Sequence, residues 1–308
     1  MKKIFISFFF FTIFFWDLNY LKSKEVRILS KIGNQIITNI DIENEYKYLI
    51  SLNKEYQKLE KEKIFNFAKS SLLREKIKEI ELKKYFDLGV QDSFLNSKIV
   101  ELYKKLGFSN LEDFQKYLDQ FDLRIEDIAR KIEIELKWNK LVYDKYKDKL
   151  VINEKVLKKK IIDESKNRNT FNLSELIFSY KTEQENKKKM TEITKSIKEI
   201  GFENTVLIFS EAESRKTSGN LGWVNELGLS KKILEKLKNI DVSEITEPIQ
   251  LQNAILILKL NDKKKIQMSS INVEEELREL IKFETNKQLN IFSTIYFKKI
   301  KNKLNINE

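Results

Sequence analysis

Glycine and proline are scarce in this chain, with seven glycines and one proline among 308 residues. Tight turns between neighbouring strands depend on these two residue types, so their scarcity argues against sandwiches and barrels with many strands. Long stretches rich in Lys, Glu, Ile and Leu favour helices instead. The length allows two or three domains. We therefore expect an α+β protein that is mainly helical and carries a small antiparallel sheet.

The sequence contains no cysteine and no histidine. Without cysteine, disulfides, thiol nucleophiles and thiolate metal sites are excluded. Without histidine, the usual general base and the commonest zinc ligand are missing. The 47 acidic residues are spread along the chain, and no pair of them stands out as a catalytic site. We accordingly expect no metal and no cofactor, and we assign no catalytic residue.

The formal charge of +11 at pH 7 makes nucleic acid a partner to consider. Most of the excess is lysine mixed with glutamate on the same predicted helices, without an arginine-rich stripe or an aromatic RNA-binding signature. The abundance of Lys, Ile and Asn is typical of AT-rich coding. We therefore expect no nucleic-acid partner, and peripheral contact with an anionic membrane is the alternative use of the charge.

The N-terminus has the pattern of an export signal. Lys2 and Lys3 precede an uncharged run, Ile4–Trp16, which Asp17 ends. A bilayer-spanning helix needs about 20 apolar residues, so this shorter run predicts a signal peptide over residues 1–23 and a periplasmic location. Ser23 is the only small residue near the expected cleavage site, which makes the cleavage motif poor. An uncleaved inner-membrane anchor is the alternative.

A hairpin and a series of helices are expected next. Val26–Thr38 reads as two short strands around a turn at Gly33-Asn34. Thr38 and Asp41 match a capping box that should open a helix ending near Leu52. Further helices are expected over 61–86, 93–106, 110–120, 123–149 and 153–165.

Near residue 170 the pattern becomes mixed. Strands are expected over 171–179, 221–225, 245–251 and 254–260, with helices over 183–200, 203–209 and 230–239. This order can form a small antiparallel sheet with helices packed against it. A long helix over 273–301 and a short strand over 304–306 should follow.

Three segments carry a resemblance to the parvulin family of peptidyl-prolyl isomerases. Asn172–Ile177 (NLSELI) resembles the family's first strand, Phe209–Val224 its loop and second strand, and Glu247–Leu260 its closing strands. Together with the flanking segments they resemble the SurA-type periplasmic chaperones, in a version with a single parvulin unit. The resemblance implies four segments. Residues 1–23 form a signal peptide, and residues 24–168 form a helical N-terminal domain. Residues 169–264 form a parvulin-like domain, and residues 265–308 form a C-terminal helix and strand packed on the N-terminal domain.

The parvulin resemblance also implies a peptide site. The family's two histidine positions fall on Glu175 and Leu256, its acid or thiol position on Ala212, its hydroxyl position on Asn253, and its proline-ring positions on Leu229 and Ile233. These replacements leave a peptide-binding pocket without the family's polar groups. Glu175 could still act electrostatically, but the expected isomerase activity is weak or absent.

The resemblance to SurA-type chaperones implies a function. The expected function is ATP-independent holding of unfolded outer-membrane or other exported proteins, with the parvulin-like domain as a degenerate peptide-binding unit. The alternative is an active parvulin-type isomerase that assists folding, either free or membrane-tethered.

Overall fold

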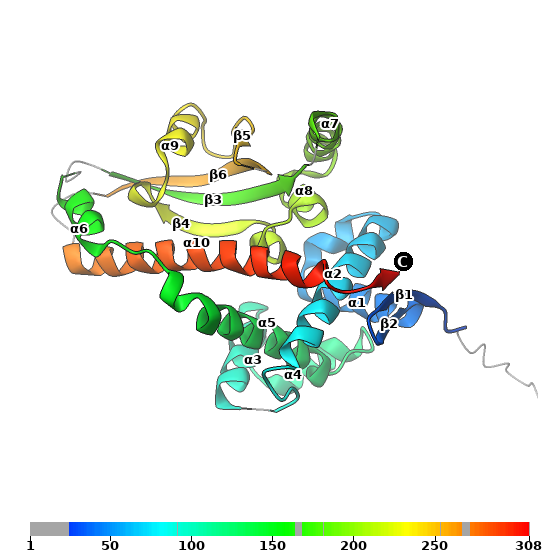
Figure 1. The fold of residues 1–308 in the computed structure, drawn as a ribbon. Helices are drawn as coiled ribbons and strands as arrows, with labels where there is room; N and C mark the ends of the chain where they lie inside the picture. The colour runs from blue at the N-terminus through cyan, green and yellow to red at the C-terminus, as the bar shows by residue number, and fades with distance from the viewer. Residues whose placement is uncertain are drawn as a thin grey trace, which may run out of the picture.

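The computed structural model describes residues 25–90, 92–163, 168–180, 182–252, 254–266 and 272–307. They form a helical unit, built from both the first and the last described segments, and a sheet unit over 168–266 that lies above it (Figure 1). The predicted signal peptide lies outside the described residues. Among the described residues, no helix has the length and apolar character needed to cross a membrane. The predicted α+β class, mainly helical with a small antiparallel sheet, is confirmed.

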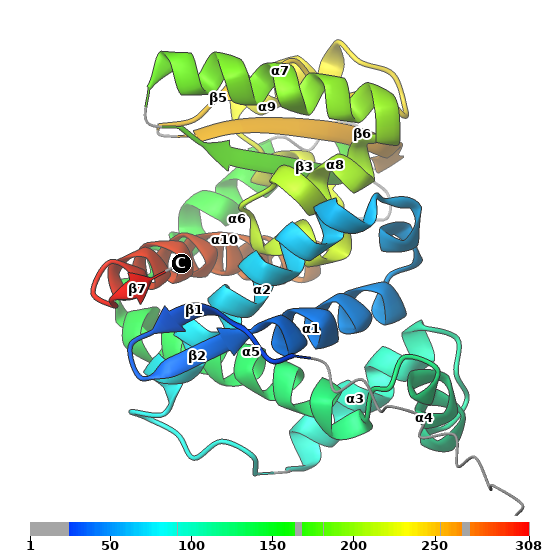
Figure 2. The same ribbon diagram turned by 90° about the vertical axis from the view of Figure 1, so that its right-hand side faces the viewer.

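A three-stranded sheet joins the two ends of the helical unit. Strands β1 (Ile28–Ile32) and β2 (Gln35–Thr38) form the predicted hairpin, and β7 (Ile306–Asn307) pairs with the free edge of β1 (Figure 2). The sheet order is β2-β1-β7, and all pairs are antiparallel. Thr38 and Asp41 form the predicted capping box, so α1 begins directly after the hairpin.

The helices of the helical unit enclose two apolar clusters. The larger one is centred on α2 and includes Phe67 and Trp138, while the smaller lies around Phe114 and joins α3, α4 and α5. The helices are α1 (Asn39–Leu52), α2 (Lys61–Leu82), α3 (Ser93–Lys105), α4 (Leu111–Asp119), α5 (Ile125–Tyr146), α6 (Glu154–Asp163) and α10 (Val273–Lys301).

The sheet unit contains four antiparallel strands in the order β4-β3-β6-β5. The long strands β3 and β6 pair along their whole length, and apolar clusters cover both faces of the sheet. One cluster involves α9 and the other α7 and α8. The elements are β3 (Arg168–Ser179), α7 (Glu183–Ile200), α8 (Phe202–Phe209), β4 (Asn220–Asn225), α9 (Lys231–Lys238), β5 (Ile249–Gln250) and β6 (Ala254–Ile266).

Helix α10 connects the two units, running beneath the sheet and alongside α5 (Figure 1). At its start, the carboxylate of Glu276 accepts hydrogen bonds from Arg168 at 3.0 Å and from Asn225 at 2.7 Å, both in the sheet unit. In its second half, the indole N–H of Trp138 donates to Ser293 at 2.9 Å. The chain after the sheet unit therefore returns to complete the helical core.

Several predicted boundaries need correction: the strand expected over 254–260 extends to Ile266, and the strand expected over 304–306 is Ile306–Asn307. The helix expected over 61–86 ends at Leu82, and residues 83–86 form a turn in which the Phe86 N–H still bonds the Leu82 carbonyl. The strand expected over 245–251 is reduced to Ile249–Gln250, with a separate bridge between Ile245 and Lys259. Pro248 lies between them and has no N–H to donate to a ladder, which explains the interruption.

Deletion of residues 302–308 should destabilise the helical unit, because it removes β7 and leaves one edge of β1 unpaired. Loss of this short pairing should cost about 1–2 kcal/mol, since it removes a few backbone hydrogen bonds. Hydrogen exchange should accelerate in residues 26–52 and remain unchanged in β3 and β6. Unchanged exchange in residues 26–52 would contradict this prediction.

Candidate peptide-binding site

Three of the predicted site residues belong to one apolar cluster on the α9 side of the sheet. Leu256 on β6 is buried in this cluster, and Leu229 and Ile233 pack against it while remaining partly exposed. Leu229 precedes α9 and Ile233 lies in its first turn, whose N-cap is the Ser230 hydroxyl. The sheet and α9 together therefore present an apolar surface with partial access to solvent.

Glu175 lies on β3, two residues before Ile177, which pairs with Leu256. Its carboxylate accepts a hydrogen bond of 2.8 Å from the Ser214 hydroxyl. Burial raises the pKa of Glu175, and the Ser214 hydrogen bond only partly offsets this effect. Glu175 is thus a half-buried carboxyl group with one hydroxyl partner beside an apolar cluster.

The loop after α8 brings Ala212 to the same strand. The Ile177 carbonyl accepts a hydrogen bond of 2.7 Å from Glu211, and the Ile177 N–H donates to the Ser210 hydroxyl at 3.2 Å. Ile177 is therefore the centre of this group. Glu175 lies two residues before it on β3, Leu256 is its cross-strand partner, and Ala212 directly follows Glu211, which bonds its carbonyl. Asn253 lies outside the described residues.

Gly219 closes the loop against β3. Its carbonyl accepts the Glu175 N–H at 2.8 Å, and its own N–H donates to the Ser214 carbonyl at 2.8 Å. Its φ is +82°, and a Cβ added to it would lie 2.3 Å from the Glu175 carbonyl oxygen. Only glycine fits this position, and it fixes the contact between Glu175 and Ser214.

Replacement of Ser218 with glycine should stabilise the sheet unit. Ser218 is in the left-handed region at φ +54°, where a side chain costs about 1 kcal/mol relative to glycine. S218G should therefore raise the free energy of unfolding by up to about 1 kcal/mol, measured by urea denaturation. A decrease would show that the long contact between the Asn53 amide and the Ser218 hydroxyl, 3.4 Å, outweighs the backbone strain.

An ionic cluster joins the same loop to the helical unit. Lys78 on α2 is almost completely buried, and its ammonium group lies 2.7 Å from the Glu135 carboxylate on α5 and 3.9 Å from Glu213 in the loop. Lys216 of the loop pairs with the second oxygen of Glu135, and Arg74 lies 3.7 Å from Glu213. We call these five residues the interface cluster. Burial alone would raise the pKa of Glu135, but Lys216 and Lys78 hold it at about 2.

Apolar and cation–π contacts reinforce this junction. Leu207 of α8 is fully buried in the larger apolar cluster of the helical unit, the one centred on α2. The Arg215 guanidinium lies 3.9 Å from the centre of the Phe67 ring and donates to the Leu207 carbonyl at 2.8 Å. Burial lowers the pKa of Arg215 to about 10. The loop that carries Ser214 is thus held by both units.

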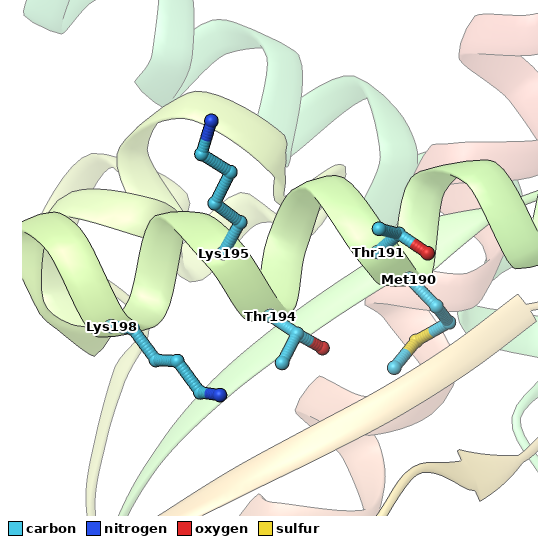
Figure 3. Close-up of a pocket in the computed structure, with 5 residues that line it drawn as sticks. All are labelled: Met190, Thr191, Thr194, Lys195 and Lys198. Atoms are coloured by element: carbon cyan, nitrogen blue, oxygen red, sulfur yellow. The ribbon is translucent and has the colours of Figure 1, made fainter.

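Two open grooves lie elsewhere, beside α7. One, of about 460 Å³, is lined by α7 alone, and Met190, Thr194 and Lys198 point to one side of the helix while Lys195 points to the other (Figure 3). The second, of about 450 Å³, is lined by α7, α8 and the segment around Ile245. Neither contains a predicted site residue or a set of groups suited to catalysis.

The sequence prediction did not identify Ser214 and the interface cluster. Ser214 stands in a polar segment without a motif of its own, and the charges of the cluster come from three separate elements. Only the fold brings these groups together.

Residues 170–262 match the family model of the PPIC-type PPIase, or rotamase, domain. The sheet unit is therefore a parvulin domain of the PPIC type. The chain as a whole is similar to the chaperone SurA of Buchnera aphidicola subsp. Schizaphis graminum, at 25% identity over 296 residues and 85% of this chain. It spans 64% of the length of that relative.

Solved structures of related proteins are also similar. A chain from a structure of SurA-like chaperones of Campylobacter jejuni is 19% identical, with 91% of this chain and 98% of that chain covered and a TM-score of 0.36. PrsA from Bacillus subtilis is 17% identical, with coverage of 90% and 92% and a TM-score of 0.30. Both TM-scores are low.

Proposed function

We propose that this protein is a periplasmic, ATP-independent chaperone that holds unfolded exported proteins, and that its parvulin domain binds peptide segments without isomerising them. The observation that carries the proposal is the apolar cluster of Leu229, Ile233 and Leu256 beside one half-buried carboxyl group. The similarity to the chaperone SurA supports the holding function. In this proposal residues 24–168 and 265–308 form the client-holding domain and residues 169–264 the peptide-binding domain.

Unfolded outer-membrane proteins are the proposed clients. Their barrel strands expose alternating apolar and aromatic residues, which an apolar groove can bind without sequence specificity. Release of such clients requires no chemistry in the chaperone. Export would be accompanied by loss of residues 1–23, and N-terminal sequencing of the periplasmic form tests this step. A full-length chain that stays with the membrane after a salt wash would instead indicate a foldase tethered by an uncleaved N-terminal anchor.

An active isomerase is the second candidate, and the Glu175–Ser214 pair is the observation that favours it. The uncatalysed barrier to prolyl rotation is about 18–20 kcal/mol, and its reduction requires groups that weaken amide resonance or stabilise the twisted bond. The chain has no histidine or cysteine to supply the family's polar groups. A single carboxyl with a raised pKa is a poor substitute for that cluster.

Two assays on the same preparation separate these functions. We expect suppression of the aggregation of an unfolded barrel protein, and no measurable acceleration of prolyl isomerisation in a model peptide. L229E and I233E should weaken client binding, with the exposed Val156 replaced by Glu as the control. Acceleration that disappears in E175Q would overturn the proposed loss of chemistry. A protein that neither binds clients nor slows their aggregation would overturn the chaperone function.

A further inference from the structure

Exposed aliphatic side chains gather on the hairpin and in the residue pair just before it. Val26 is 61% exposed, Ile28 64%, Leu29 40% and Ile36 47%. Ile32 and Ile37 of the hairpin are instead buried against the helical core. We call the group of Val26, Ile28, Leu29 and Ile36 the hairpin face. A cluster of exposed aliphatic side chains on so small a sheet marks an interaction surface.

Basic side chains surround the hairpin face. Arg27 lies between Val26 and Ile28 in the sequence, just before β1. Lys31 lies on β1 and is the cross-strand partner of Ile36. Lys301 is the last residue of α10 and Lys303 lies in the turn that leads into β7, where the Asn305 carbonyl accepts a hydrogen bond from Gly33 N–H at the tip of the hairpin. All four are exposed, and the structure shows no ion pair for any of them within the described part of the chain. The exposed Glu25 is an opposing charge in this region, and the Asp41 carboxylate at the end of β2 is hydrogen-bonded to Thr38.

The hairpin face also follows closely on the most apolar segment of the sequence. Nine residues, Asp17 to Glu25, separate the uncharged run Ile4–Trp16 from Val26, and they include Lys22 and Lys24. In the chain that retains the run, a fully extended linker of nine residues spans about 30 Å, so the hairpin cannot lie far from a bilayer that contains the run. The basic residues continue from this linker into the rim of the hairpin face.

We propose that the hairpin face docks on an anionic lipid bilayer, with its four aliphatic side chains at the boundary between headgroups and acyl chains and with Arg27, Lys31, Lys301 and Lys303 on the headgroup phosphates. An apolar surface with a rim of unpaired cations is the composition that interfacial membrane binding requires. The docking would hold the helical unit at the membrane through β1 and β2, which lie below the sheet unit in Figure 2. This inference does not depend on whether the protein holds clients.

The lack of cysteine in the chain permits a direct test with the full-length protein, since any introduced cysteine is a unique labelling site. L29C and I36C, each carrying an environment-sensitive fluorophore, are mixed with vesicles of neutral lipid or of neutral lipid with phosphatidylglycerol. I291C is the matched control, because Ile291 is 52% exposed on α10 and lies outside the hairpin face. We expect blue-shifted emission and quenching by brominated lipid at positions 29 and 36, with anionic vesicles, and neither effect at position 291.

Charge reversal separates docking from simple tethering by the apolar run. R27E and K31E together should reduce the affinity for anionic vesicles, measured by quenching at position 36, by about 25-fold or more, since each basic residue near such a surface changes binding about fivefold. Quenching that the charge reversal leaves unchanged would show that the run alone brings the hairpin near lipid, and it would overturn the proposal. Blue-shifted emission at position 29 before vesicles are added would also overturn it, because a protein segment or a second copy would then cover the face.

Discussion

Gly219→Ala should lower the free energy of unfolding of the parvulin domain by about 2–4 kcal/mol, because the positive φ costs about 1 kcal/mol and the steric overlap about 1–3 kcal/mol more. The added Cβ would meet the Glu175 carbonyl oxygen at 2.3 Å, so the loop would have to move away from β3. The hydrogen bond between Ser214 and Glu175 should then be lost. Urea denaturation followed by hydrogen exchange in residues 173–177 would measure both effects.

Gly222→Ala is the matched control for this substitution. Gly222 has a similar positive φ of +68°, but a Cβ there would meet no atom within 4 Å. The control should therefore lose only the backbone contribution of about 1 kcal/mol. Equal losses in the two variants would mean that close approach to Glu175 is not what requires glycine at position 219.

Glu135→Ala should destabilise the protein by about 3 kcal/mol or more, because removal of one partner leaves the other charge buried and unpaired. Lys78 would keep only Glu213, at 3.9 Å, while remaining buried beside the Trp138 ring. Lys78→Met with Glu135→Leu should recover most of the loss, since an apolar pair replaces the buried ions. Glu112→Ala is the control, because its pair with Lys116 is exposed and should contribute under about 0.5 kcal/mol.

The pH dependence of stability offers a second measurement on the interface cluster. The pKa of Glu135 in the folded protein is about 2, below its ordinary value of 4.5, so the folded state favours the ionised form. Its contribution is complete above about pH 4.5 and is lost as the pH falls toward 2. Because the carboxylate is partly exposed, we expect a difference of about 1–2 kcal/mol between wild type and Glu135→Gln across this range. Parallel curves for the two proteins would contradict this assignment.

Local signals in the sequence specified most secondary structure. The capping box at Thr38 and the helix over Val273–Lys301 were predicted with the bounds observed, since side-chain caps and apolar periodicity act over a few residues. Local reasoning was less accurate where a strand depends on distant partners. The last strand begins at Ile306 instead of Leu304 because its register is set by β1.

The candidate site was predictable only in part. The resemblance to parvulins located Glu175, Leu229, Ile233 and Leu256, but it gave no indication that Ser214 would bond Glu175. It also gave no indication that the same loop would be held by Lys78 and Glu135. Those contacts depend on how the two units are packed, and no local sequence pattern encodes the relative placement of separate helices.

The pairing of β7 with β1 has a consequence for the order of folding. Lys31 and Asn307 are partners in the sheet, although almost the entire chain separates them. Strands β3 and β6 are much closer in sequence, so the parvulin domain can fold from its own segment while the helical unit still lacks α10. Contacts between distant segments form slowly, because a long loop must close before they contribute. A chain that emerges from a translocation channel N-terminus first would therefore complete its first-emerged unit last, and that unit would remain open until the final residues arrive.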